Sequence, residues 1–181
     1  MKSFYLTLAF SIGILSGIAA QSKGPLPAAV VAKKPNYALQ QLSDAATDAS
    51  GMVTLLNMKT NETEKVHRDS VYRLMVYPPM DQAAEPNFPM EVLAFSNVQE
   101  LWVGMRPFTS LPEAIGGLRN LESLDLSDTK ITTLPKSVLT LDHLRNLVLY
   151  GTAIPKEEMA RLNTMLIDAF PNLLIMSPNY N

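Results

Sequence analysis

The chain of 181 residues contains no cysteine, two histidines and a single tryptophan. Without cysteine it can form neither disulfides nor thiolate metal sites, and it has no thiol nucleophile. His67 and His143 have no second ligand at metal-binding spacing, so we expect both to be ordinary surface side chains. We find no catalytic constellation and no phosphate-binding glycine loop. We therefore predict that the protein is not an enzyme and uses no cofactor.

Charge is also scarce. Charged residues make up 18% of the chain, and the formal net charge is -2. The chain has no excess of positive charge that could bind the phosphates of nucleic acid, so we expect no nucleic-acid partner. Apolar residues make up 47%, as in an ordinary globular protein, and the length suits one domain with a real core.

The N-terminus has the pattern of a targeting segment. Lys2 precedes an almost wholly apolar stretch from Phe4 to Ile18, and small residues follow up to Ala20. This pattern predicts a cleaved secretory signal peptide over residues 1–20, with an uncleaved anchor as the alternative. The stretch is short for a membrane span, and no cysteine follows that could carry a lipid anchor. We expect a secreted or periplasmic protein without membrane insertion after cleavage, beginning with a flexible leader over residues 21–36.

One apolar template recurs along the middle of the chain. A Leu-Pro pair opens it at Leu111 and again 23 residues later at Leu134, and most of the template also fits the stretch from Phe88 to Val103. A fixed period of this length predicts a solenoid, in which each repeat buries its apolar face only against its neighbours.

Two consecutive copies resemble the leucine-rich repeat signature, in its 23-residue class: Leu121-x-x-Leu124-x-Leu126-x-x-Thr129-x-Ile131 and Leu144-x-x-Leu147-x-Leu149-x-x-Thr152-x-Ile154. The resemblance covers about residues 71–176. The chain also resembles small exported bacterial proteins of that family. The resemblance implies a short α/β solenoid with a concave parallel sheet, and protein recognition as its usual role. The family usually has asparagine where this chain has Thr129 and Thr152. A threonine hydroxyl can form the same kind of hydrogen bond with the turn backbone, but the bond is weaker than that of asparagine.

The segments on either side of the repeats predict caps. We expect an N-terminal cap over residues 37–70, with a helix from Tyr37 to Ala49, a strand from Met52 to Met58 and a polar loop from Lys59 to Asp69. The repeats then occupy residues 71–154, interrupted by an irregular excursion from Pro78 to Pro86. Residues 155–181 predict a C-terminal cap with a helix after Pro155 and a final strand over Leu173–Met176.

Alternation along the strands predicts which side chains face out. Leu124 and Leu126 should point into the solenoid, so Ser123, Asp125 and Ser127 should point outward. The same offsets in the other repeats predict a partner-binding face on the concave sheet: Arg73, Met75, Tyr77, Glu100, Trp102, Asp125, Val148 and Tyr150.

Two further readings of this face stay open. The Pro78–Pro86 excursion or the leader could cover Trp102 and Tyr77 instead of leaving them to a partner. Asp125 and Asp128 are too few ligands for calcium, so we expect both carboxylates to be solvated.

The sequence therefore favours a secreted or periplasmic module that binds a protein or peptide through its concave face. A structural envelope protein without a specific ligand is one alternative. An accessory or cryptic hydrolase, with its chemistry in the excursion beside Asp81 and Glu85, is the other.

Overall fold

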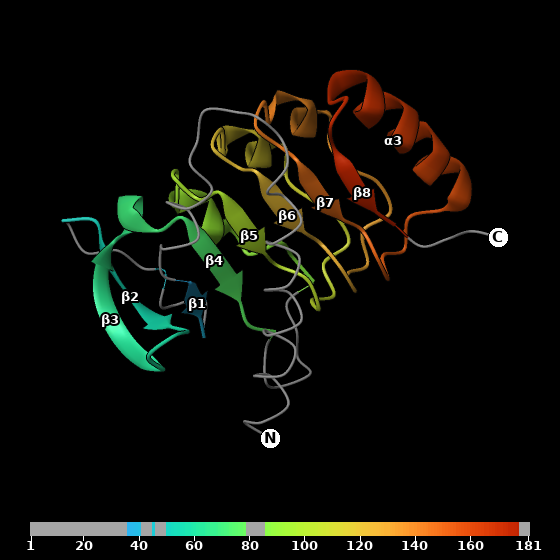
Figure 1. Cartoon of the computed structure of the whole chain (residues 1–181). Helices are drawn as coiled ribbons and strands as arrows, with labels where there is room; N and C mark the ends of the chain where they lie inside the picture. The colour runs from blue at the N-terminus through green and yellow to red at the C-terminus, as the bar shows by residue number, and fades with distance from the viewer. Residues whose placement is uncertain (1–35, 41–44, 46–49, 79–85, 178–181) are drawn as a thin grey trace. The chain divides into compact units, whose positions relative to one another are not determined.

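A computed structural model describes residues 36–40, 45, 50–78 and 86–177. The predicted signal peptide, nearly all of the leader and most of the Pro78–Pro86 excursion, with Asp81 and Glu85, lie outside these residues. Within the described residues eight strands form one sheet in the order β3-β2-β1-β4-β5-β6-β7-β8 (Figure 1). Their bounds are β1 Tyr37–Leu39, β2 Met52–Asn57, β3 Glu62–His67, β4 Arg73–Val76, β5 Glu100–Trp102, β6 Ser123–Asp125, β7 Asn146–Val148 and β8 Leu174–Met176.

The strands from β4 to β8 are parallel to their neighbours. A short 3₁₀ helix lies between most of them, namely η4 (Met90–Ala94), η5 (Glu113–Gly117) and η6 (Lys136–Thr140). The α-helix α3 (Lys156–Ala169) lies between β7 and β8, while η3 (Arg68–Ser70) precedes β4. Each strand therefore returns to the sheet through a helical segment, as an α/β solenoid requires.

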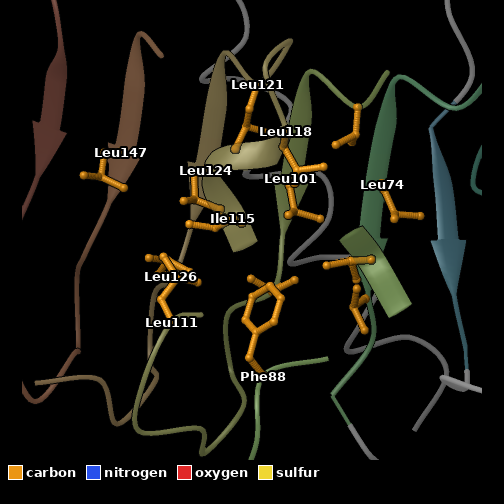
Figure 2. Packing of buried hydrophobic residues seen from close by; sticks show 14 of the residues in the cluster. Leu74, Phe88, Leu101, Leu111, Ile115, Leu118, Leu121, Leu124, Leu126 and Leu147 are labelled. Atoms are coloured by element: carbon orange, nitrogen blue, oxygen red, sulfur yellow. The ribbon is translucent and has the colours of Figure 1, made fainter. Parts of the chain in front are cut away.

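The core is a stack of equivalent leucines (Figure 2). Leu74, Leu101, Leu124 and Leu147 pair in register along the sheet, and none is more than 1% exposed. The following inward positions are at most 3% exposed: Val76, Val103, Leu126 and Leu149. Phe88 and Phe108 close the wide first repeat with an edge-to-face contact, their ring centroids 5.5 Å apart.

The turns that leave the strands repeat one backbone feature. Met105, Asp128 and Gly151 all have positive φ, at 58°, 54° and 70°, and each lies 23 positions after the one before. The Met105 and Asp128 amides donate to the carbonyls of Ser127 and Tyr150 in the following repeat. Only Gly151 takes this conformation without steric cost. The residue types at these positions differ too much for sequence to reveal the feature.

The two threonines perform the role expected of them. The hydroxyl of Thr129 donates to the carbonyl of Leu126 at 2.8 Å, and that of Thr152 donates to the carbonyl of Leu149 at 2.9 Å. Thr129 is completely buried, so this bond satisfies a hydroxyl that would otherwise be costly to desolvate.

The N-terminal cap begins differently from the prediction. Residues Tyr37–Leu39 form strand β1, not the start of a helix, and β1 pairs antiparallel with β2 and parallel with β4. All three residues are buried, and β1 lies between β2 and β4 rather than at an edge of the sheet. The spacing of two between Tyr37 and Leu39 fits a strand, whereas the helix prediction rested on the later positions up to Ala49. Most of the remaining span up to Ala49 lies outside the described residues.

The predicted strand over Met52–Met58 is confirmed as β2, but the predicted loop after it is wrong. Residues Glu62–His67 form β3, which pairs antiparallel with β2 along its whole length. β3 is an edge strand, and charged edge strands are common because they discourage pairing with other chains. The carboxylate of Glu64 accepts hydrogen bonds from Asn57 Nδ2 at 2.8 Å and from the Tyr37 hydroxyl at 3.2 Å, which joins the three strands of the cap.

The C-terminal cap has the predicted helix and strand. Pro155 precedes α3, whose Met159, Leu162 and Leu166 are buried against the core. No helix in the described ranges is long and apolar enough to cross a membrane. Glu158, in the first turn of α3, receives two hydrogen bonds of 2.7 Å from Arg161 and one from the hydroxyl of Thr133 in the preceding repeat. This carboxylate thereby connects the cap to the solenoid.

Glu158→Gln tests that connection through its pH dependence. The bonds from Arg161 and Thr133 lower the pKa of Glu158 from 4.5 to about 2. A carboxyl with a lowered pKa in the folded state stabilises the fold at pH values above its unfolded pKa, and loses that effect as the pH falls through the folded pKa. We expect the variant to be less stable than the parent at neutral pH, and the difference to shrink between pH 4.5 and pH 2. Urea denaturation over a pH series measures it, and a difference independent of pH would contradict the role of the charge.

Candidate functional site

The outward face of the sheet contains the predicted partner-binding residues, in rows set by strand register. One row runs across the parallel strands through Met75, Trp102, Asp125 and Val148. The register extends this row to Ala38 in β1 and to Met176 in β8. The sequence-based prediction of the partner-binding face included neither Ala38 nor Met176. The alternation of Leu173–Met176, taken with its predicted strand, could have placed Met176.

A second row begins with an ion pair. Arg73, Glu100, Ser123 and Asn146 are in register, and Leu174 of β8 ends the row. Arg73 Nε lies 2.8 Å from Glu100 Oε2, and the two side chains are only 11% and 16% exposed. Arg73 is thus largely buried within the face, although the prediction gave it as an outward contact residue. The cause is its lateral contact with Glu100 and Trp102, which removes the long side chain from solvent.

Arg73 also fixes the tryptophan. Its guanidinium carbon lies 5.8 Å from the centroid of the Trp102 ring, within the range of a cation–π contact. Trp102 is partly exposed, whereas Leu101 beside it is buried in the core. The indole is therefore a surface group held in one place by its neighbours.

The third row lies at the ends of the strands. Tyr77, Gly104, Ser127 and Tyr150 occupy equivalent positions, and the backbone of Tyr77 donates to Leu39 of β1. A side chain at Gly104 would collide with the carbonyl and hydroxyl of Ser127, so glycine is required there by the close approach of two repeats. Tyr150 is 63% exposed, the highest value among the exposed large hydrophobic side chains of the described residues.

Asp125 differs from its prediction. It points outward as expected but is only 7% exposed, so the expectation of a solvated carboxylate is wrong for this residue. The register explains the burial, since Trp102 and Val148 flank it on the neighbouring strands. Asp125 Oδ1 accepts a hydrogen bond from the Ser127 amide at 2.8 Å. Burial raises the pKa of this carboxyl, although the bonds from Ser127 oppose the shift. Asp128 is exposed, in agreement with its prediction.

The spacing of the rows decides the architecture. From β5 to β7 each strand pairs with the residue 23 positions further on, Glu100 with Ser123 and Ser123 with Asn146, and the core leucines follow the same register. The sequence repeat is thus also the structural repeat. The fold is that of a leucine-rich repeat solenoid. The intervals before β5 and after β7 are longer, at 27 and 28 residues, because the first repeat contains the excursion and the last contains α3.

Comparison with known proteins adds only partial likenesses. No protein-family profile matches this chain, and no curated protein is significantly similar to it. A leucine-rich repeat protein of Leptospira interrogans is 26% identical over 58% of this chain and 24% of its own length, with a TM-score of 0.43. Internalin C2 of Listeria monocytogenes is 16% identical over 61% of this chain and 43% of its own, with a TM-score of 0.43. The internalin inlF of the same organism is 17% identical over 59% and 34%, with a TM-score of 0.39. The chain spans less than half the length of each.

Proposed function

We propose that the protein binds a partner protein through the outward face of its sheet, with Trp102 and Tyr150 as anchors. The observation that carries the proposal is the position of the tryptophan. The only tryptophan of the chain is partly exposed on the sheet, whereas the leucines beside it fill the core. Tryptophan and tyrosine are enriched among residues that dominate binding energy at interfaces.

The surroundings of Trp102 support this role. Met75 flanks it in the same row, with Val148 two strands further along, and all three are partly exposed. The ion pair of Arg73 with Glu100 holds one side of the indole in place before any partner arrives. A preorganised side chain loses little conformational freedom on binding, which favours affinity.

The proposal includes export of the protein. The charged start, the apolar stretch and the small residues of positions 1–20 support secretion or a periplasmic location. The partner is then a protein or peptide of the cell envelope or the exterior. The predicted cleavage can be tested by N-terminal sequencing of the protein recovered from its own host, which should begin near Gln21.

The double variant Trp102→Ala/Tyr150→Ala tests the binding proposal. We expect it to abolish recovery of the partner by affinity capture from envelope extract, since each anchor contributes on the order of 2 kcal/mol or more. We expect the free energy of unfolding to fall by only about 1 kcal/mol, because Trp102 loses a surface contact with Arg73 and Tyr150 is exposed.

The matched control is Met90→Ala/Ile167→Ala, which removes two side chains of similar exposure, 53% and 54%, that lie on η4 and α3 and not on the sheet. The control should capture the partner as the parent does. Equal capture by the Trp102/Tyr150 variant would refute the proposal. So would a loss of several kcal/mol of stability, since Trp102 would then belong to the core.

A further inference from the structure

A buried acidic side chain lies at the centre of the outward face. Asp125 occupies the middle of the row between Trp102 and Val148, and it is 7% exposed while both neighbours are partly exposed. Carboxylates are seldom buried to this extent without a positively charged partner, because desolvation disfavours the charge. The environment of Asp125 is therefore unusual for a surface strand.

No lysine, arginine or histidine in the part of the chain that the structure describes forms an ion pair with Asp125. Arg73, the arginine on this face nearest in strand order, is engaged with Glu100 at 2.8 Å. Asp128, which follows Asp125 in the turn, is also acidic and raises the pKa of Asp125 further. Desolvation, the bonds from Ser127 and the charge of Asp128 are the causes of the pKa shift of Asp125, and no basic group is among them.

The fold itself does not require the negative charge. Both the amide and the side chain of Ser127 bond this carboxyl, and the side-chain oxygen of an asparagine would still accept the bond from the amide. The equivalent positions in the adjacent repeats are Trp102 and Val148, whose side chains accept no hydrogen bond at all, yet their strands leave the sheet in the same way. The negative charge is therefore not needed for this turn and is available for another purpose.

We propose that Asp125 selects a basic side chain of the partner, so that the bound segment is a peptide carrying a lysine or arginine among apolar residues. This rests on the proposed function and specifies the class of ligand. A guanidinium or ammonium group would supply the missing counter-charge and hydrogen-bond donors. The apolar stem of the same side chain would lie between Trp102 and Val148, which suits an amphipathic residue. The flanking apolar residues would contact Met75 and Tyr150.

The test selects ligands without assuming their sequence. A library of random dodecapeptides displayed on phage is selected on the full chain, with depletion on the Trp102→Ala/Tyr150→Ala variant to remove peptides that bind elsewhere. We expect the enriched peptides to share one lysine or arginine flanked by apolar residues. The best of them is then synthesised, together with a version in which citrulline or norleucine replaces the basic residue, both of which are uncharged.

Binding of these peptides is followed by the fluorescence of the single tryptophan. We expect the uncharged peptide to bind the parent protein at least about tenfold more weakly than the basic one. Asp125→Asn keeps the acceptor for Ser127 and should weaken the basic peptide equally, without further loss for the uncharged one. Asp128→Asn, which removes the weaker neighbouring charge, is the matched control and should weaken the basic peptide by less than about twofold, with no change for the uncharged peptide.

The outcomes separate the two proposals. Enriched peptides without a common basic position, or an uncharged peptide that binds within about twofold of the basic one, would overturn the selection by Asp125 while leaving binding at this face intact. The absence of any peptide that depends on Trp102 and Tyr150 would overturn the proposed function, and this inference with it. Even if Asp125→Asn does not fold, the affinities of the two peptides for the parent protein show whether the face selects a basic side chain.

Discussion

Replacing Leu124 with alanine is expected to lower the free energy of unfolding by about 2–5 kcal/mol, the range for truncating a fully buried leucine. Leu124 has no exposed surface, and its side chain lies in the ladder between Leu101 and Leu147 (Figure 2). In a solenoid each repeat is stabilised only by its neighbours, so a cavity at this position weakens two repeat interfaces at once. Chemical denaturation followed by circular dichroism measures the change.

Ser123→Ala is the matched control, since the same strand presents Ser123 to the opposite side of the sheet. It should change stability by no more than about 0.5 kcal/mol. If Leu124→Ala and Ser123→Ala were equally mild, the assignment of the two sides of β6 would be wrong, and with it every row of the outward face.

Arg73→Met is expected to destabilise the protein by about 2–3 kcal/mol, because it leaves the carboxylate of Glu100 nearly buried without its partner. Adding Glu100→Gln should restore most of that loss, since the second change removes the uncompensated charge. A double-mutant cycle on the free energy of unfolding measures the coupling between the two side chains.

The same pair of variants reports on the tryptophan. Once Arg73 is gone, the indole of Trp102 loses its cation–π neighbour, and its fluorescence should become more accessible to a soluble quencher. Additive effects of the two substitutions, with unchanged quenching, would mean that the ion pair contributes nothing to the arrangement of the face.

The repeats could be predicted from sequence because their signal is redundant. Leu124 and Leu147 occur at the same offset in two copies, so a single register accounts for the strands, the buried ladder and the order of the rows. The C-terminal cap could also be predicted, because Pro155 is followed by Met159, Leu162 and Leu166 at helical spacing. Period and alternation are properties that a chain displays locally.

The N-terminal cap could not be predicted in the same way, because it occurs once. The apolar spacing from Tyr37 to Ala49 as a whole suggests a helix, and only pairing with both β2 and β4 shows that Tyr37–Leu39 form a strand. Similarly, the polar residues Glu62–His67 resemble a loop until β2 supplies a partner along their whole length. Tertiary pairing determines the conformation of both segments, and no short-range pattern contains that information.

For the candidate site, alternation predicted which residues share the outward face but not their burial. Arg73 and Asp125 are polar residues at outward positions, and sequence alone gives no reason to expect them to be shielded. Their shielding arises from lateral neighbours 23 or 27 positions away, Trp102 and Val148 for Asp125 and Glu100 for Arg73.

The most direct measurement is photo-crosslinking from two exposed positions in the organism that makes the protein. A photoreactive phenylalanine analogue is placed at position 150, at the end of a sheet row, or at position 167, on α3; the native side chains there are 63% and 54% exposed. The account predicts one defined protein adduct from position 150 and none from position 167. An adduct formed only from position 167, or no adduct from position 150, would contradict binding through the outward face.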